Sequence, residues 1–416
     1  MPINKENLPA TIEEVVGGQP VTDIHTHLYA AAFGELLLWG VDELITYHYL
    51  IAETFRKADV TYEAYWAMSR SEQADLIWRT LFIENSPISE SCRGVATALN
   101  DLGLDLSTRD LNEYRQYFAN LTPEEHIDKV FSLANVKEAV MTNDPFDDLE
   151  RPVWEKGAAF DERFKAALRI DPLLNSYAET GREKLSAEGY NVDEELSETA
   201  LAEIRRFLSD WIKKMKPKYM AISLPPDFAY PAASARGKIL HECVLPVSRD
   251  RGVPFAMMIG VTRAVNPQLQ LAGDGVAKAD MRAVENICCE NPDNKFLVTV
   301  LSRENQHELC VIGRKFPNLM IFGCWWFMNN PSIIEEMTRE RIELLGLSVI
   351  PQHSDARILD QLVYKWKHSK AIIADVLTDK YSDLLDSGWR LEREEIERDV
   401  AGLLGENFDR FIGAST

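Results

Sequence analysis

The sequence predicts an α/β fold: a (β/α)8 TIM barrel with a large helical insertion after its first strand. Eight short apolar runs alternate with amphipathic stretches of helical spacing along the chain. Most of these runs are almost continuously apolar, which is typical of parallel strands buried on both faces. Strands and helices that alternate in this number indicate a closed barrel. The predicted strands cover Val21–Leu28, Glu138–Thr142, Phe164–Ile170, Tyr219–Leu224, Pro254–Ile259, Lys295–Leu301, Leu319–Cys324 and Leu347–Gln352.

We expect a single domain over residues 1–416, within which residues 29–135 form the helical insertion. About 110 residues separate the first two strands, far more than a crossover helix needs. Because the insertion follows a strand, we expect it to cap the barrel mouth, where the active site of this fold lies. Thr122, which precedes Pro123, is a predicted helix N-cap. The expected helical segments are Phe33–Lys57, Tyr62–Phe82, Ser89–Leu102, Thr108–Asn120 and Pro123–Ala134.

Composition narrows the classes of function. The chain is 46% hydrophobic with a net charge of −21, so we expect neither nucleic acid nor an anionic membrane as partner. No apolar run approaches the roughly 18 residues of a membrane span, and the N-terminus lacks a signal-peptide pattern. The six cysteines form no C-x-x-C pair and are expected to be reduced thiols in a cytoplasmic protein. We also expect the chain to form a homo-oligomer.

His25 and His27 stand at the end of the first predicted strand. Residues two apart on a strand point to the same face, so the two imidazoles would meet at the mouth of the barrel. Two neutral imidazoles form half of a divalent-metal site. The alternative interpretation is that both histidines simply pack at a strand end.

Asp355 follows the eighth predicted strand. In a closed barrel this strand pairs with the first, so Asp355 would approach His25 and His27. Two imidazoles and a carboxylate would hold one divalent metal ion, with zinc as the first candidate, and leave positions open for substrate. Asp355 could instead act as a general base beside the metal. His353 is expected to pack behind the site rather than to bind the metal.

Arg357, Arg169 and Arg303 lie at or just after predicted strand ends. A guanidinium group binds a carboxylate or phosphate through two parallel hydrogen bonds, so all three are candidates to bind an anionic substrate. Local arginines are needed because the net charge of the chain would repel an anion. The alternative for each is a surface ion pair. Arg357 is the strongest candidate because it lies two residues beyond Asp355.

Two aromatic pairs are further candidates. His48 and Tyr49 lie in the helical insertion, where an imidazole and a phenol could polarise a sugar carbonyl or move a proton. Trp325 and Trp326 follow the seventh strand and could line a sugar pocket. For both pairs the alternative is aromatic packing.

Over its whole length the chain resembles the uronate isomerases (glucuronate isomerases), a branch of the amidohydrolase superfamily. An H-x-H pattern alone is common, but here six segments occur together, in the order and with the spacing of that family. They are Thr22–Leu28, Tyr47–Tyr49, Thr142–Pro145, Phe164–Pro172, Gly323–Phe327 and Ser354–Arg357.

One residue departs from the common form of the family, so the chain looks closest to a divergent branch. Met258 stands where the common form has a histidine followed by Ile-Gly. A thioether cannot replace an imidazole as a proton carrier or as a ligand for a hard metal. Because no histidine ends the sixth run and no lysine ends the fourth, we expect one metal ion rather than a binuclear hydrolase centre.

The resemblance implies reversible isomerisation of D-glucuronate to D-fructuronate and of D-galacturonate to D-tagaturonate. It implies proton transfer from C2 to C1 through a cis-enediolate, with a hydride shift as the alternative. Asp355 would be the base for the C2 proton, Tyr49 would handle the C1 proton, and His48 would open the ring or bind a hydroxyl. Arg357 and Arg169 would bind the carboxylate, and the metal would hold sugar oxygens. A carboxylate that binds Zn²⁺ is a weaker base, so the two roles of Asp355 compete.

Two other functions fit the same residues. One is a mononuclear metal-dependent hydrolase, with metal-bound hydroxide as nucleophile and Asp355 as its base. The other is a sugar-acid binding protein without turnover, which the loss of a histidine at Met258 suggests. The set of arginines and the insertion that carries His48 and Tyr49 favour the isomerase.

Overall fold

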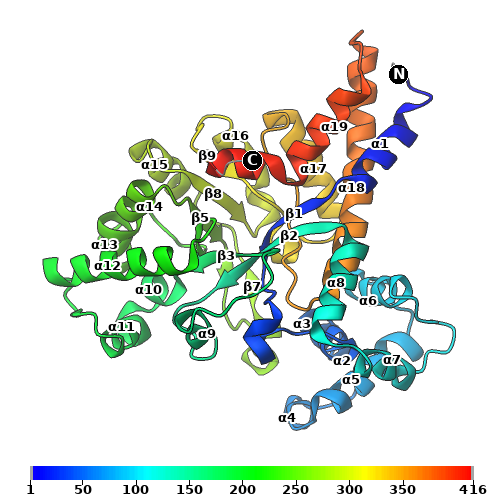
Figure 1. Ribbon diagram of the computed structural model, residues 1–416, viewed down its shortest axis with the longest axis horizontal. Helices are drawn as coiled ribbons and strands as arrows, with labels where there is room; N and C mark the ends of the chain where they lie inside the picture. The colour runs from blue at the N-terminus through cyan, green and yellow to red at the C-terminus, as the bar shows by residue number, and fades with distance from the viewer. Residues whose placement is uncertain (1–2, 414–416) are drawn as a thin grey trace.

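The computed structural model describes residues 3–413. Seven parallel strands form a curled sheet in the order β1-β2-β3-β4-β5-β8-β9, and helices surround it (Figure 1). Every residue of β1, β4, β5, β8 and β9 is buried, as the continuously apolar runs predict. The predicted parallel α/β fold is therefore confirmed. The strands are β1 Val21–Thr26, β2 Val136–Asn143, β3 Phe164–Arg169, β4 Met220–Leu224, β5 Phe255–Ile259, β8 Phe296–Val300 and β9 Leu319–Ile321.

Helices connect the strands, as the alternating pattern predicts. The helices that precede β2 are α1 Leu8–Gly18, α2 Val41–Ile45, α3 His48–Thr54, α4 Tyr62–Trp66, α5 Arg70–Trp78, α6 Glu90–Asp101, α7 Leu111–Ala119 and α8 Pro123–Ala134. Those between β2 and β8 are α9 Arg151–Glu155, α10 Asp171–Asn175, α11 Arg182–Ala187, α12 Glu198–Met215, α13 Ala235–Ile239, α14 Leu245–Arg251 and α15 Arg282–Glu290. After β8 come α16 Gln306–Gly313, α17 Pro331–Leu345, α18 Gln361–Asp386, α19 Arg393–Ala401 and α20 Asn407–Ile412.

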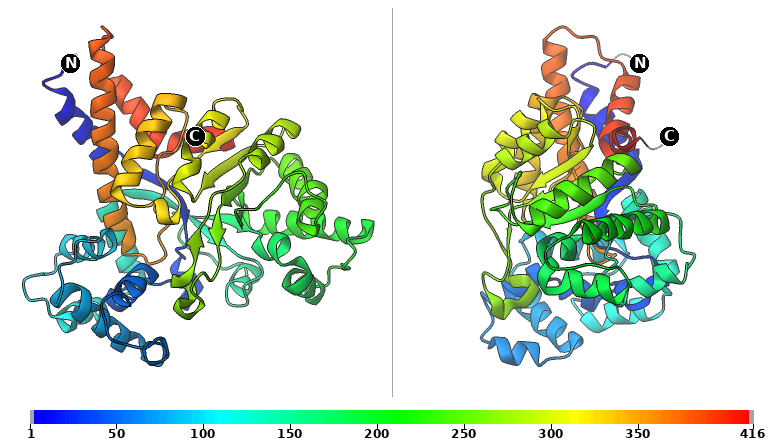
Figure 2. Two further views of the ribbon diagram at one scale, coloured as in Figure 1. Left: turned by 180° about the vertical axis from the view of Figure 1, so that it is seen from behind. Right: turned by 90° about the vertical axis from the view of Figure 1, so that its left-hand side faces the viewer.

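The helices between β1 and β2 gather at one end of the molecule, and the N-terminal helix α1 lies beside α18 toward the other end (Figures 1 and 2). Helix α8 begins with the predicted N-cap. The hydroxyl of Thr122 accepts from the backbone N–H of Glu125, whose carboxylate accepts from the N–H of Thr122. Among residues 3–413 no helix is both long and apolar enough to cross a membrane.

Residues 350–356 join the two ends of the curled sheet through backbone hydrogen bonds. On the β9 side, the N–H of Gly323 donates to the carbonyl oxygen of Ile350 at 2.8 Å. On the β1 side, the N–H of Asp355 donates to the carbonyl oxygen of His25 at 3.1 Å. The segment that carries Asp355 therefore lies directly against the strand that carries His25.

The regular eighth strand predicted over Leu347–Gln352 is absent from the part of the chain that the structure describes. This segment forms a single isolated bridge, from Ile350 to Phe322. Pro351 has no N–H to donate to a ladder, and Asp355 has a left-handed backbone with φ of 50°. The proline interrupts the repeating hydrogen bonds within the predicted segment, and the left-handed backbone at Asp355 stops a strand from continuing beyond it.

Candidate active site

A cavity of about 240 Å³ lies where the parallel strands end. Side chains from the ends of β1, β3 and β4, from the chain between β1 and β2, from residues 263–271, from the segment after β9 and from residues 355–357 line it. The lining residues are His27, Tyr47, His48, Arg169, Ser223, Arg263, Leu271, Trp325, Trp326, Asp355 and Arg357.

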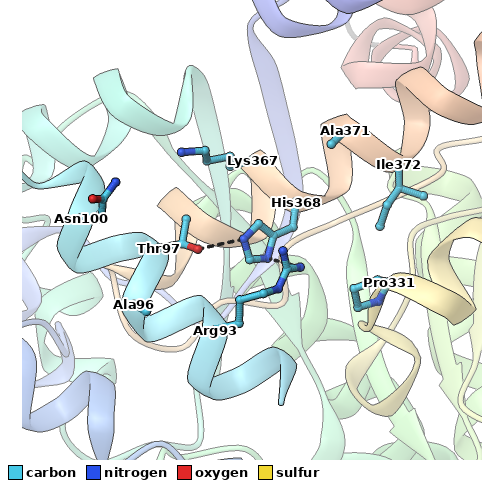
Figure 3. Close-up of a pocket in the computed structure, with 9 residues that line it drawn as sticks. All are labelled: Arg93, Ala96, Thr97, Asn100, Pro331, Lys367, His368, Ala371 and Ile372. Atoms are coloured by element: carbon cyan, nitrogen blue, oxygen red, sulfur yellow. Dashed lines mark hydrogen bonds between the residues drawn. The ribbon is translucent and has the colours of Figure 1, made fainter. Parts of the chain in front are cut away.

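A larger hollow of about 660 Å³ lies on the outside of the molecule, between α6 and α18 (Figure 3). Its imidazole, His368, is already bonded at both nitrogens, through Nδ1 to Glu90 at 2.6 Å and through Nε2 to Thr97 at 3.0 Å. Both ring nitrogens of this imidazole are thus occupied by protein groups. The smaller cavity at the strand ends is therefore the candidate active site.

His25, His27 and Asp355 come together as the sequence predicts. Each offers one ligand atom, and these atoms lie within 4.8 Å of one another. Nε2 of His25 lies 3.7 Å from Oδ1 of Asp355, and Nε2 of His27 lies 3.5 Å from the same oxygen. Within residues 3–413 this is the one such group of His, Cys, Asp and Glu side chains. His353 packs behind it, with its ring 5.0 Å from that of His25.

Burial controls the charge of these three groups. It lowers the pKa of His25 to about 3 and holds the pKa of His27 well below its usual range. Burial also raises the pKa of Asp355 to about 6, against the opposing charges of Lys365 and Arg357. At neutral pH the imidazoles are thus uncharged and the carboxylate is mostly ionised, which are the states that bind a divalent metal.

The carboxylate of Asp355 is held in place from several sides. Its Oδ2 accepts from the backbone N–H of Trp326 at 3.1 Å, and both residues have left-handed backbones, with φ of 50° and 46°. The preceding residue, Ser354, donates its N–H to Asp23 at 3.0 Å, and its carbonyl oxygen accepts from buried Lys365 at 2.6 Å. A strained backbone that its surroundings fix in this way is typical of functional sites.

His48 and Tyr49 both lie in α3, but only His48 lines the cavity. His48 lines the cavity, and its Nε2 accepts from the indole N–H of Trp326 at 3.2 Å. Because an indole only donates, the ring proton of neutral His48 is on Nδ1. Tyr47, which the sequence analysis did not select, also lines the cavity. The predicted Tyr49 is not a lining residue; its ring stacks on Phe327 at 5.9 Å, and its buried hydroxyl has no partner among residues 3–413.

Two of the three predicted arginines reach the cavity. Arg169 extends from the end of β3 and pairs with Asp171 at 2.9 Å, which raises the pKa of Arg169 above its usual value. Arg357 also lines the cavity, and no ion pair engages it within residues 3–413. The prediction for Arg303 needs correction. The chain turns into a short helix after β8, so Arg303 instead forms an exposed ion pair with Glu336 at 2.9 Å.

A third cavity arginine, Arg263, was not among the three predicted anion-binding arginines. Arg263 pairs with Asp274 at 2.5 Å, and its guanidinium lies 5.8 Å from the ring centre of Trp326. The loop that carries Arg263 connects two short antiparallel strands, β6 Val261–Thr262 and β7 Gly275–Val276. Strands of two residues leave no periodic pattern, so only the position of Arg263 after β5 could have identified it.

Solved structures of known proteins resemble this chain. No protein-family model matches the chain, and no curated protein does. A solved uronate isomerase from Bacillus halodurans C-125 is 60% identical, with a TM-score of 0.98 over 99% of this chain and 98% of that one. Two others share the fold: a uronate isomerase from Thermotoga maritima (16% identity, TM-score 0.78, 99% and 100% coverage) and a glucuronate isomerase from Caulobacter crescentus (13%, 0.72, 99% and 95%). By its identity to the first of these over nearly its full length, the chain belongs to the uronate isomerase family.

Proposed function

We propose that this chain interconverts D-glucuronate and D-fructuronate, and D-galacturonate and D-tagaturonate. The observation that carries the proposal is the 60% identity to a uronate isomerase over 99% of the chain. The cavity supports it, because a buried carboxylate, imidazoles, a phenol and guanidinium groups surround one small space. Isomerisation of a sugar acid needs a base near C2, donors for the sugar oxygens and a cation for the distant carboxylate.

His25, His27 and Asp355 are the proposed ligands of one divalent metal ion, with zinc as the first candidate. Nε2 of His25 and Oδ1 of Asp355 are buried and have no hydrogen-bond partner among residues 3–413. Buried polar atoms without partners are costly, and neutral imidazoles with a carboxylate form a common zinc ligand set, so the three residues fit the ion. A bound metal would polarise the sugar oxygens and so acidify the proton on C2.

Asp355 is the proposed base for that proton. Once the sugar ring is open, the carboxylate takes the proton from C2, and the C–H electron pair forms the C1–C2 double bond of a cis-enediolate. The negative charge then lies on the former aldehyde oxygen. A proton adds to C1, the hydroxyl on C2 loses its proton to become the carbonyl, and the oxygen on C1 gains one. In the alternative hydride shift, the hydrogen of C2 moves to C1 with its electron pair and does not exchange with solvent.

Tyr49 is the proposed partner for the proton at C1, and His48 is proposed to open the ring or bind a hydroxyl. The free Nδ1–H of His48 makes it a donor, since Trp326 occupies Nε2. The buried hydroxyl of Tyr49 has no partner among the described residues, and burial raises its pKa well above the usual value, with smaller contributions from Tyr47 and Asp355. Tyr47 is the alternative phenol because it lines the cavity.

Arg357 and Arg169 are the proposed partners of the substrate carboxylate, and Trp325 and Trp326 the walls against the sugar C–H faces. Residues 350–356 would complete the barrel as its eighth member, which their backbone bonds to both ends of the sheet support. Residues 29–135 would cap its mouth, since two residues of this insertion, Tyr47 and His48, line the cavity.

The test is proton NMR of D-glucuronate with the protein in D2O, with and without added Zn²⁺. We expect the ketose to form, with deuterium at its C1 if an enediolate exchanges with solvent. Asp355→Asn should reduce turnover about 100- to 10,000-fold, the usual contribution of a general base, and retain its fold by circular dichroism. Failure of the wild-type protein to convert either uronate would contradict the function, whereas an active Asp355→Asn variant would contradict only the role of Asp355.

A further inference from the structure

Tyr219 contacts His25 and is not one of the residues that line the cavity. It immediately precedes β4, and both residues are completely buried. The hydroxyl of Tyr219 contacts two groups of the first strand: Nδ1 of His25 at 3.1 Å and the carbonyl oxygen of Ile24 at 2.7 Å. Its ring packs against Phe322 and Phe408, which fix its position inside the barrel.

The directions of these two hydrogen bonds follow from the atoms involved. A phenol has one proton, and a carbonyl oxygen can only accept, so the proton of Tyr219 points to Ile24. The Tyr219 oxygen must then accept from His25, which places the ring proton of His25 on Nδ1. This leaves the lone pair of His25 on Nε2, the atom that lies 3.7 Å from Oδ1 of Asp355.

We propose that Tyr219 is a positioning residue that holds His25 as its Nδ1–H tautomer and so turns the lone pair of Nε2 toward the metal site. This inference rests on the proposed metal site. A histidine that binds a metal through one nitrogen needs the other nitrogen bonded to an acceptor, which fixes the tautomer and the orientation of the ring. In most such sites that acceptor is a carboxylate, a backbone carbonyl or water; here a phenol oxygen serves because its own proton is engaged by Ile24.

The opposite arrangement is the competing possibility. If Tyr219 donated to His25, the ring proton of His25 would lie on Nε2 and point at Asp355, and no metal could bind there. The shorter contact of the hydroxyl, 2.7 Å to Ile24 against 3.1 Å to His25, favours the first arrangement. The two arrangements differ in which nitrogen of His25 carries the proton, and this can be measured without any metal.

The first experiment is ¹⁵N NMR of metal-free wild-type protein with labelled histidine at one fixed pH, with His25 assigned from the signal lost in His25→Asn. We expect a protonated Nδ1 and an unprotonated Nε2. In Tyr219→Phe the Nδ1–H loses its acceptor, so a population with the proton on Nε2 should appear. A wild-type His25 with its proton on Nε2 would overturn the proposal.

The second experiment measures the dissociation constant of Zn²⁺ by competition with a chelator. Tyr219→Phe should bind Zn²⁺ about tenfold to hundredfold more weakly than the wild type, the usual loss when the partner of a metal-binding histidine is removed. Tyr65→Phe is the matched control, because Tyr65 is also fully buried and its hydroxyl has no partner among residues 3–413. Equal affinity of Tyr219→Phe and Tyr65→Phe would overturn the proposal.

The outcomes separate this inference from the proposed metal site. If the wild-type protein binds no Zn²⁺, the metal site is wrong, and the tautomer of His25 still decides the role of Tyr219. If Tyr219→Phe fails to fold, the wild-type spectrum alone decides it.

Discussion

Replacing Arg357 with methionine tests how the cavity recognises an anion. The three arginines of the cavity differ in their partners: Arg169 pairs with Asp171 and Arg263 with Asp274, whereas Arg357 has no ion pair among residues 3–413. Among the three, Arg357 is therefore the one whose guanidinium forms no ion pair with a carboxylate of the described chain. Truncating one partner of a buried, hydrogen-bonded charge pair costs about 2–5 kcal/mol, so kcat/KM for D-glucuronate should fall about 30-fold to several thousand-fold.

The assay is the initial rate of ketose formation over a range of uronate concentrations. The loss should appear mainly as a higher KM if Arg357 holds the carboxylate equally in the ground state and the transition state. Arg303→Met is the matched control, because its exposed ion pair with Glu336 lies outside the cavity, and its kinetics should stay within about twofold of the wild type. A kcat/KM for Arg357→Met within threefold of the wild type, or an equal loss in Arg303→Met, would refute the reasoning.

Three further predictions concern single side chains. Tyr49→Phe should slow ketose formation about 100-fold or more and Tyr47→Phe much less; the reverse order of rates would assign the proton at C1 to Tyr47 instead. Burial raises the pKa of Glu150 from 4.5 to about 7. Between these pH values Glu150 is protonated in the folded protein and ionised in the unfolded chain, so the stability of the wild type falls as the pH rises from 4.5 to 7. The free energy of unfolding of Glu150→Gln, relative to the wild type, should therefore rise by about 3 kcal/mol between pH 4.5 and pH 8, as urea denaturation at both pH values would measure, and a pH-independent difference would contradict it. Thr122→Ala should destabilise the protein by about 1 kcal/mol in the same assay because it removes the N-cap of α8, while Thr122→Ser should retain most of the stability.

The residues on neighbouring strands were predictable from the sequence. A buried strand that ends in His-x-His, and a carboxylate after the last apolar run, meet in any closed arrangement of parallel strands. No regular eighth strand forms among the described residues. The hydrogen bond from the N–H of Asp355 to the carbonyl oxygen of His25 nevertheless holds the two residues side by side. Strand order alone therefore brought the three proposed metal ligands together.

The residues beyond strand ends were harder to predict, because a loop decides where each side chain points. Arg303 and Arg263 both follow a strand end, yet only Arg263 reaches the cavity. After β8 the chain enters a short helix and carries Arg303 outward, whereas after β5 a small hairpin returns the chain over the site. Tyr47 and Tyr49 show the same limit between β1 and β2: Tyr47 lines the cavity, whereas Tyr49, two residues later, stacks on Phe327 instead.

The chemistry of the two buried histidines depends on contacts that no local pattern contains. Trp326 lies 278 residues from His48 in the sequence, and Tyr219 lies 194 residues from His25. Trp326 donates to Nε2 of His48, so the free nitrogen of His48 is a donor. The acceptor that we propose at Tyr219 engages Nδ1 of His25, so the free nitrogen of His25 carries a lone pair. The same tautomer would thus give the proposed sugar-binding residue a hydrogen-bond donor and the proposed metal ligand a lone pair, because opposite ring nitrogens are occupied.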